Sequence, residues 1–224
     1  MVGRSADLGR VVEAAGQEAS HFGHRYIGPE HLLLGMLRDS DSGAARVLRA
    51  EGMDLEMARA ALGRLAAQGV VPGPRPSDAE LLSRLGIELD AVRRDAEQAI
   101  GIRALGWAIR EATRARRCGI GRVAHTPLEG PPMLAAHALM LARERATAFG
   151  HEVVGSELLL LGVLDDVTTR PPRCMSNRWV RRLHASVGLP EDYRGVAGPL
   201  LAVSGVDLER LHAATVAALG ETVA

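Results

Sequence analysis

One stretch of sequence occurs twice in this chain in closely similar form. Residues 22–37 read FGHRYIGPEHLLLGML, and residues 149–164, 127 positions later, read FGHEVVGSELLLLGVL. A second signature, a glycine followed by x-Asp-Leu-Glu, occupies residues 52–56 and returns 153 positions later at residues 205–209. Internal repetition means that one structural unit is built more than once. The chain is therefore predicted to fold as a pseudo-twofold body, and its second copy holds 26 more residues between the two signatures than the first.

The composition favours helices around an aliphatic core. Ala, Leu, Gly and Arg dominate, aromatic residues make up only 3% of the chain, and the formal net charge is zero. Such a chain has few of the β-branched and aromatic runs that are typical of sheets. At 224 residues it exceeds a typical domain of about 100–150 residues but is short for two large ones. We therefore expect one bilobed, all-α body.

Periodicity and capping residues divide the first copy into four helices. Apolar residues at three- and four-residue spacings over residues 8–19 predict an amphipathic helix that ends near Gly23. Pro29 is favourable at a first helical position and is expected to open a short helix that is apolar nearly all round. Ser42 and Asp54 are the expected N-caps of a third and a fourth helix. Four helices are thus the predicted unit of each copy.

Three parts are expected along the chain. They are a first repeat over residues 1–68, a linker over residues 69–130, and a second repeat over residues 131–224 with an insertion at about residues 167–194. Within the linker, residues 77–99 read as the back half of a further repeat, because the glycine and acids of the second signature recur there.

Two stretches are strongly basic. Residues 103–122 contain six arginines and a single acid. In the insertion, arginines surround a tryptophan without an intervening acid, and these residues are the candidate partner surface: Arg170, Arg173, Arg178, Trp179, Arg181 and Arg182. The first stretch is either a solvated helix face or a surface for a partner. The second either forms a short helix that docks on the body through Trp179, Val180 and Leu183 or is a mobile loop that seeks a partner. If both converged, the chain would be a nucleic-acid-binding regulator whose affinity falls steeply with salt, which is the alternative function.

The repeated blocks resemble the Clp N-terminal repeat, a small helical module that precedes the ATPase rings of the ClpA and ClpC unfoldases and normally occurs as a tandem pair. The first copy has Pro29 where the family usually has Thr, and the second has Val153 for Tyr and Leu158 for His. The resemblance covers about residues 5–67 and 131–219. It implies an all-α tandem pair of four-helix repeats, here in a bacterial protein that stands alone without AAA+ modules.

No pattern points to catalysis, a cofactor or a metal. The chain contains no lysine, so a phosphate-binding loop of the Walker type lacks its essential residue. His21, His24 and His31 lie close in sequence, but we expect them to straddle a helix break rather than to face one another. His24 and His151 occupy matching positions of the two copies and are expected to bond to backbone groups.

Cysteine usage and the N-terminal sequence favour the cytoplasm. Cys118 and Cys174 form no disulfide framework or zinc motif. The first residues lack the apolar core of a signal peptide, and no apolar run approaches the roughly 18 residues of a membrane span.

Glu30 and Glu157 occupy equivalent positions at the start of the apolar helix in each copy. One interpretation is structural, because an acid there stabilises the helix dipole by about 0.3–1 kcal/mol. The other follows from the resemblance: in ClpC-type N-domains the corresponding glutamates help to bind phosphoarginine on tagged substrates, with the carboxylate taking the guanidinium. Ser5 keeps a hydroxyl where the family has Thr, whereas Pro132 stands at the matching position of the second copy. The predicted ligand-binding residues are therefore Ser5, Glu30 and Glu157.

The function that the resemblance implies is non-catalytic binding of peptides or protein substrates in the Clp protease system. The chain would act as an adaptor, a decoy or a competitor of the unfoldase's own N-domain. Expected partners are marked substrates, cyclic peptides, adaptors or Clp ATPase components, whereas a membrane is not expected and nucleic acid is only the alternative. The number of chains that assemble is left open.

Overall fold

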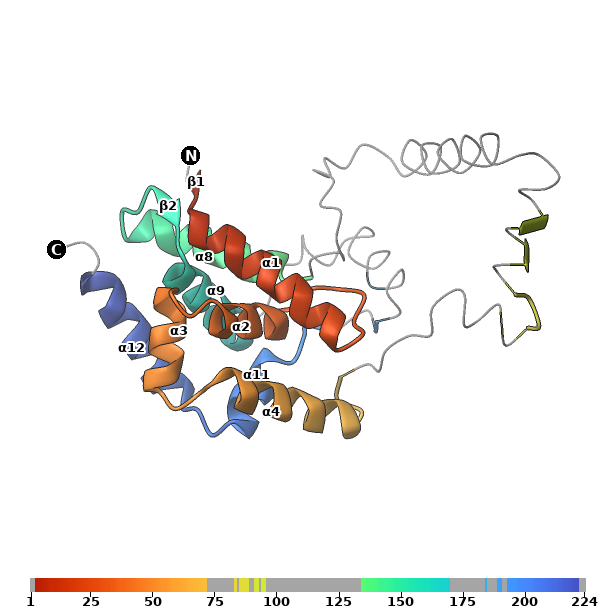
Figure 1. Cartoon of the computed structure of the whole chain (residues 1–224). Coiled ribbons are helices and arrows are strands. Elements are labelled where there is room, and N and C mark those ends of the chain that lie inside the picture. The colour runs from red at the N-terminus through yellow and green to blue at the C-terminus, as the bar shows by residue number, and fades with distance from the viewer. Residues whose placement is uncertain are drawn as a thin grey trace. The chain divides into compact units, whose positions relative to one another are not determined.

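The computed structural model describes residues 3–71, 134–169 and 193–221, together with residues 83, 85–88, 91–92, 94–95, 184 and 189–190. The chain divides into two compact units. One unit comprises Met1–Pro74 and Gly130–Ala224, and the other comprises Arg75–Glu129. The first unit contains both copies of the repeat and is described below (Figure 1).

The first copy consists of the four helices that its periodicity predicts. They are α1 (Ala6–His21), α2 (Pro29–Arg38), α3 (Gly43–Ala50) and α4 (Leu55–Ala67). The predicted caps are present: the side chain of Ser42 accepts a hydrogen bond from the Ala45 N–H at 3.1 Å, and that of Asp54 accepts one from the Met57 N–H at 2.7 Å. Gly23, with a φ of 68°, turns the chain after α1. These boundaries depend on local residues, which is why sequence patterns find them.

The second copy repeats the same order of helices. They are α8 (Ala136–Ala148), α9 (Ser156–Thr168), α11 (Ala197–Val203) and α12 (Leu208–Glu221). Compared with α1, α8 begins three residues later than the 127-residue offset predicts. The all-α class predicted from the sequence is confirmed.

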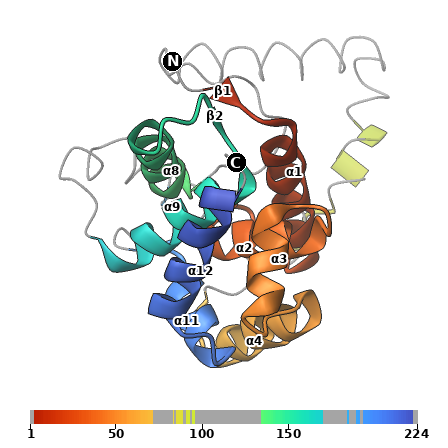
Figure 2. The ribbon, with the colours of Figure 1, turned by 90° about the vertical axis from the view of Figure 1, so that its left-hand side faces the viewer.

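A short parallel pairing joins the two copies. Strand β1 (Gly3–Arg4) pairs with β2 (Val153–Val154), with Gly3 opposite Val153 and Arg4 opposite Val154. Figure 2 shows β1 leading into α1 and lying beside β2. The start of the first copy is therefore anchored on the second copy. None of the described helices is both long enough and apolar enough to cross a membrane.

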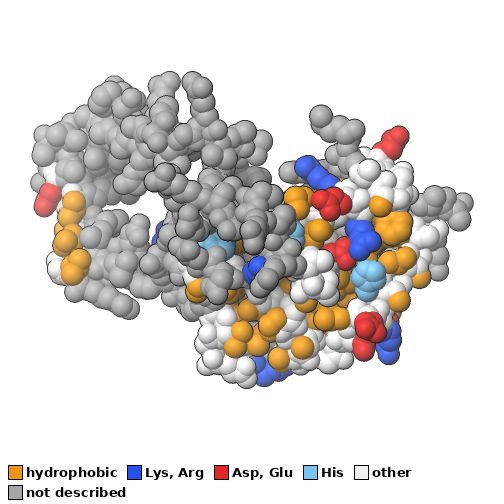
Figure 3. All heavy atoms as spheres, turned by 180° about the vertical axis from the view of Figure 1, so that it is seen from behind, with side chains coloured by type: hydrophobic (Ala, Val, Ile, Leu, Met, Phe, Trp, Pro, Cys, Tyr) orange, Lys and Arg blue, Asp and Glu red, His pale blue; other side chains and the backbone are white. Residues whose placement is uncertain are grey.

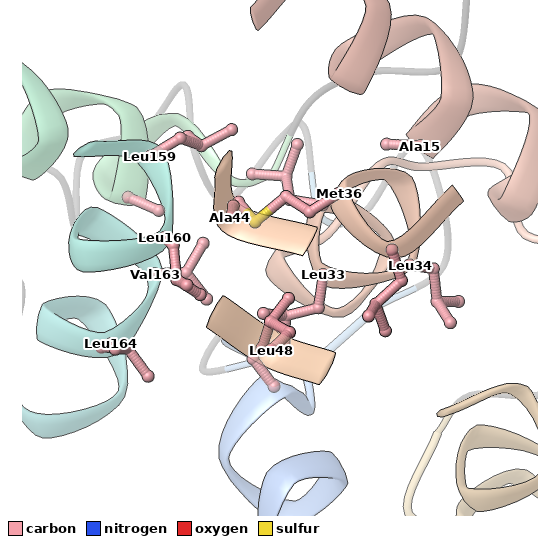
Figure 4. Close-up of a cluster of buried hydrophobic side chains, with 14 of the residues drawn as sticks. Ala15, Leu33, Leu34, Met36, Ala44, Leu48, Leu159, Leu160, Val163 and Leu164 are labelled. Atoms are coloured by element: carbon pink, nitrogen blue, oxygen red, sulfur yellow. The ribbon is translucent and has the colours of Figure 1, made fainter. Parts of the chain in front are cut away.

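Helices α2 and α9 form the centre of the core. Figure 4 shows their leucines converging with side chains of α3. Each helix carries an unbroken apolar run in which no side chain is more than 2% exposed: Leu32, Leu33 and Leu34 in α2, and Leu158, Leu159, Leu160 and Leu161 in α9. A helix buried on nearly all faces has to be apolar nearly all round, as predicted for α2.

A glycine lets the first two helices of each copy pack backbone to backbone. A Cβ atom on Gly35 of α2 would lie 2.5 Å from the carbonyl oxygen of Val11 in α1. At the equivalent position of the second copy, a Cβ atom on Gly162 of α9 would lie 2.2 Å from the carbonyl oxygen of Ala138 in α8. Both distances are shorter than any real Cβ contact, so each position requires glycine.

A buried ion pair links the helices of the first copy. Glu18 of α1 is fully buried, and its carboxylate accepts hydrogen bonds from Arg38 of α2 at 2.7 Å and from Arg59 of α4 at 2.7 and 3.0 Å. Burial raises the pKa of Glu18, but the two arginines outweigh that effect and hold it below its ordinary value. The carboxylate therefore stays charged.

The second copy contains the same ion pair with its charges exchanged. Arg145 stands at the position equivalent to Glu18, and Asp165 at the position equivalent to Arg38. Arg145 donates to Asp165 at 2.7 and 2.9 Å, and His212, the equivalent of Arg59, lies 3.7 Å from the same carboxylate. Helices α8 and α9 therefore keep the opposite-charge contact of α1 and α2, but the acidic and the basic residue have exchanged helices.

Candidate functional site

A cavity of about 640 Å³ opens between α3, the start of α9 and α12. Figure 2 shows α3 and α12 side by side. The walls of the cavity are formed mainly by small and apolar residues, with one arginine and one glutamate: Gly43, Arg46, Val47, Ala50, Glu157, Ala214, Ala217 and Ala218. The cavity therefore lies at the interface of the two copies, and one of the predicted ligand-binding residues lines it.

Glu157 lies where two helices begin. It is the second residue of α9, and a Cβ atom on Gly43, the first residue of α3, would lie only 1.6 Å from its Oε1 atom. Its Oε2 atom accepts a hydrogen bond from the Ser156 hydroxyl at 2.9 Å. The N-termini of both helices therefore lie beside this carboxylate. Because the side chain is only half-buried, its charge remains available to the cavity.

Arg46 of α3 lines the same cavity. Its side chain is exposed, and it has no hydrogen-bond or ion-pair partner among the described residues. The cavity thus presents a carboxylate and an uncommitted guanidinium.

Ser5 is the N-cap of α1. The single hydroxyl proton of Ser5 lies between two acceptors, the carbonyl oxygen of Val154 at 2.8 Å and the carboxylate of Asp7, and the hydroxyl oxygen accepts from the Leu8 N–H at 3.3 Å. The hydroxyl is therefore committed to holding the start of α1 against β2.

Asp7 connects Ser5 to the Glu157 end of α9. One of its carboxylate oxygens accepts from the Ser156 N–H at 3.1 Å. Burial raises the pKa of Asp7, but hydrogen bonds from Ser5, Ser156 and Leu8 outweigh that effect and lower it overall. Through Asp7 and Ser156, the structure brings Ser5 of the first copy near Glu157 of the second copy, and not near Glu30.

Glu30 occupies the equivalent position at the start of α2, but it is fully buried. Its Oε2 atom accepts from the Val196 N–H at 3.1 Å. Its Oε1 atom has no hydrogen-bond partner among the described residues and lies 3.5 Å from Nδ1 of His31. Cβ atoms on Gly28 and Gly195 would lie 2.3 and 2.5 Å from its carboxylate oxygens. Burial raises the pKa of Glu30.

Two histidines form a hydrogen-bonded pair beside Glu30. The Gly28 N–H donates to Nδ1 of His31 at 2.9 Å, so this nitrogen carries no proton. Nε2 of His31 lies 2.8 Å from Nδ1 of His24 and is therefore the donor in a neutral pair. Burial lowers the pKa of His24, and it lowers that of His31 to about 3. Both rings are neutral at pH 7.

This pair corrects two predictions. His24 and His31 were expected to straddle a helix break without facing one another, yet the turn at Gly23 folds the chain back and places His24 over the first turn of α2. His24 bonds to the ring of His31 and not to backbone, and the side chain of His151 makes no hydrogen bond with a described residue. In the described part of the chain, no group of three or more His, Cys, Asp or Glu is placed to hold a metal ion.

Sequence patterns gave no indication of the contact between Tyr26 and Tyr193. Their hydroxyl oxygens lie 2.8 Å apart, and their rings meet edge to face with centroids 5.7 Å apart. Burial raises the pKa of both phenols, and the nearby Glu30 raises it further. Tyr193 lies 167 residues from Tyr26, at the end of the predicted insertion, so a pattern within one copy could not reveal the pair.

The remaining candidate residues lie outside the described residues. They are the basic stretch over residues 103–122 and the partner surface of Arg170, Arg173, Arg178, Trp179, Arg181 and Arg182. The alternative of nucleic-acid binding therefore stays a prediction.

Comparison with known proteins gives a consistent result. Residues 5–78 match the family model for the Clp repeat (R) N-terminal domain. A ClpA homolog from Guillardia theta, an ATP-dependent Clp protease ATP-binding subunit, is 40% identical over 84 residues, which are 34% of this chain and 10% of that protein. The chloroplastic chaperone ClpC of Pisum sativum is 56% identical over 45 residues, or 20% of this chain and 5% of that protein. The chain thus spans no more than a tenth of either relative.

A solved structure extends the likeness to both copies. The crystal structure of the N-terminal domain of the caseinolytic protease associated chaperone ClpD from Arabidopsis thaliana superimposes with a TM-score of 0.52. It covers 97% of this chain and 94% of that one, at 13% sequence identity, and therefore supports the fold alone. Residues 5–78 accordingly resemble the Clp repeat (R) N-terminal domain in sequence, and the chain has the fold of a Clp N-terminal domain.

Proposed function

We propose that this chain is a non-catalytic protein-interaction module of the Clp protease system, which captures a charged side chain of a peptide or protein partner in the Glu157 cavity. The family match supports the Clp context, because the relatives are Clp ATP-binding subunits and chaperones in which the matched region is a small part. The observation that carries the proposal is the presence of Glu157 and Arg46 together in the wall of one open cavity between the copies. Adaptor, decoy and competitor roles are all compatible with such a module.

The chemistry of the cavity favours a ligand that carries both a guanidinium and an anion. The carboxylate of Glu157 can accept paired hydrogen bonds from a guanidinium, and the guanidinium of Arg46 can do the same for a phosphate or carboxylate. The alanines of α3 and α12 leave room for an aliphatic stem between the two charges. A volume of about 640 Å³ is in the usual range for small-ligand sites. A phosphoarginine side chain has these features.

Ser5 enters this proposal as a supporting residue. It does not line the cavity, and its hydroxyl is occupied by Val154 and Asp7. Direct contact of Ser5 with a ligand phosphate stays a prediction from the sequence.

Calorimetric titration tests the proposal directly. Free phosphoarginine and a short peptide containing it are titrated into the protein, with the unmodified arginine peptide as comparison. Glu157→Gln keeps the shape of the side chain but removes its charge, and a hydrogen bond to a charged group contributes about 1.5–3 kcal/mol. We therefore expect the affinity to fall by about 10- to 100-fold.

The matched control is Glu13→Gln, which neutralises an exposed acid of α1 outside the cavity and should leave the affinity unchanged. Arg46→Gln should lower the affinity for the phosphorylated ligand more than the affinity for the unmodified peptide. The proposal fails if the folded wild type shows no saturable binding of any of these ligands, or if Glu157→Gln binds as the wild type does.

A further inference from the structure

Helix α9, which carries Glu157, has no capping side chain of its own at its start. Its N-cap residue is Gly155, which has no side chain that could accept a hydrogen bond. In α2 the side chain of His31 accepts from the N–H of the N-cap residue Gly28 at 2.9 Å, but the equivalent position of α9 holds Leu158. The first N–H groups of a helix have no partner within the helix. Those of α9 therefore need an acceptor from another part of the chain.

Asp7 of the first copy supplies such an acceptor. Its Oδ2 atom accepts from the N–H of Ser156, the first residue of α9, at 3.1 Å. Its Oδ1 atom accepts from the Leu8 N–H at 2.9 Å and is hydrogen bonded to the Ser5 hydroxyl. The carboxylate is thus fixed on its own helix α1 by one oxygen and reaches α9 with the other. The start of α9 is anchored on a side chain that belongs to the other copy.

An equivalent contact cannot form at the start of α2. By the 127-residue offset, Ser156 corresponds to Pro29, which has no N–H to donate, and Asp7 corresponds to Leu134, which has no oxygen in its side chain. Both the donor and the acceptor are therefore replaced in the copy that holds Glu30. Of the two helix starts, the contact between an acid and a backbone N–H of the other copy serves that of Glu157.

Ser156 links Asp7 to Glu157. Its side chain is fully buried, and its hydroxyl donates to Oε2 of Glu157 at 2.9 Å. The same hydroxyl helps to lower the pKa of Asp7, so it lies near both carboxylates. A Cβ atom on Gly155 would lie 3.5 Å from Oε2 of Glu157 and 3.9 Å from Oδ2 of Asp7. The two carboxylates therefore lie close to the same glycine, and Glu157 is the one that lines the cavity.

We propose that Asp7 is a positioning residue of the Glu157 cavity, and that its charge sets how strongly the cavity prefers an unmodified over a phosphorylated arginine side chain. By anchoring Ser156, Asp7 holds the first turn of α9 and, with it, Glu157 in place. Its negative charge attracts an unmodified guanidinium and opposes a phosphate. Asp7 and Arg46 therefore act in opposite directions on a phosphorylated ligand. The inference rests on the proposed function for the ligand, but not for the anchoring of α9.

Amide hydrogen exchange, followed residue by residue by NMR, tests the anchoring without any ligand. In Asp7→Ala the Ser156 N–H loses its acceptor, so its exchange should be about tenfold faster than in the wild type. Asp54→Ala is the matched control, because Asp54 likewise accepts from an N–H at the start of a helix, that of Met57 in α4, and α4 does not line the cavity. This control should lower the melting temperature about as much as Asp7→Ala does, but leave exchange at Ser156 unchanged.

Calorimetric titration with an arginine peptide and its phosphoarginine counterpart tests the selectivity. Asp7→Asn keeps an oxygen for the Ser156 N–H but removes the charge. We expect its affinity for the unmodified peptide to fall by about two- to fivefold, while its affinity for the phosphorylated peptide does not fall. A purely structural role would lower both affinities by the same factor. The ratio of the two affinities therefore separates selectivity from stability, and Asp54→Ala should keep the wild-type ratio.

The positioning role has its own readout. Asp7→Ala removes the anchor as well as the charge, so it should bind both peptides more weakly than Asp7→Asn does. This additional loss should disappear when Glu157→Gln is also present, because the anchor acts through Glu157. Thermal melts should show a single cooperative transition for every variant.

The inference is overturned if Ser156 exchanges at the wild-type rate in folded Asp7→Ala, or if the ratio of the two affinities is unchanged in folded Asp7→Asn. It is also overturned if the additional loss in Asp7→Ala persists alongside Glu157→Gln. If the wild type binds neither peptide, the proposed function fails and the selectivity fails with it. The exchange result at Ser156 then still decides whether Asp7 anchors α9.

Discussion

The exchanged ion pairs of the two copies lead to a quantitative stability prediction. Glu18 is fully buried and bonded to Arg38 and Arg59 at 2.7 Å each, so Glu18→Arg would bring three guanidinium groups together without an anion. Breaking a buried pair so that a charge is left uncompensated costs about 3–5 kcal/mol. A change of 1 kcal/mol shifts the melting temperature of a chain of this size by about 2–4 °C, so we expect a loss of about 6–20 °C.

The second copy supplies the compensating change. Glu18→Arg combined with Arg38→Asp reproduces the residues that stand at positions 145 and 165, where the arginine and the aspartate are bonded at 2.7 Å. Arg59 would then face the new aspartate, as His212 faces Asp165. We expect the double variant to recover at least half of the free energy of unfolding lost in Glu18→Arg. Because Arg38→Asp alone also removes a bond to Glu18, this recovery corresponds to a coupling of at least about 2 kcal/mol between the two positions.

Urea denaturation of the wild type, both single variants and the double variant measures this coupling. Arg10→Ala is the control, because it removes an exposed pair with Asp39 and should change the free energy of unfolding by less than about 1 kcal/mol. If the effects of the two single substitutions simply add in the double variant, the interpretation of the second copy as a charge-exchanged equivalent is wrong.

Two other predictions concern packing and pH. In Gly35→Ala the new Cβ would lie 2.5 Å from the Val11 carbonyl oxygen, so the free energy of unfolding should fall by about 1–3 kcal/mol. Gly63 lies on an open face of α4, so Gly63→Ala should raise the free energy of unfolding by about 0.5–1 kcal/mol. Thermal melts of both variants check this contrast. The pKa of His31 is lower in the folded state, so its contribution to stability is present above the unfolded value of about 6.5 and is lost as the pH falls toward 3. His31→Leu, which installs the residue of the second copy, should flatten the loss of stability between pH 7 and pH 5 in urea titrations, and an unchanged slope would contradict the neutral histidine pair.

Local sequence signals were sufficient for the helices of the first copy. The caps Ser42 and Asp54, and Pro29 at the first position of α2, act within one turn, so the boundaries that they predict are present. The exchanged ion pair was also accessible from sequence, since aligning the copies places Glu18 opposite Arg145. That comparison is informative because the sign of the charge is reversed at both aligned positions, from Glu18 to Arg145 and from Arg38 to Asp165.

The burial of Glu30 could not be predicted from the sequence, because the residues that enclose it come from a distant part of the chain. Tyr193 and Gly195 lie at the end of the predicted insertion of the second copy and just after it, and only the fold brings them to α2. For the same reason the sequence could not show that the pairing of β1 with β2 carries Ser5 to the Glu157 end of α9. On the face shown in Figure 3, described apolar and charged side chains are interspersed, so this face gives no further guide to the site.

The crossed contacts between the copies have a consequence for how such a chain can be divided. Strand β1 pairs with the other copy, and each glutamate touches the third helix of the other copy. This is the pattern of an isologous dimer whose two subunits have been joined end to end. A fragment holding either subunit alone would expose its half of the shared interface, so fragments cut in the connecting segment are expected to reassociate. Because the two subunits are parts of one chain, their sequences can differ. One of them could therefore acquire Tyr193 while the other kept an open surface.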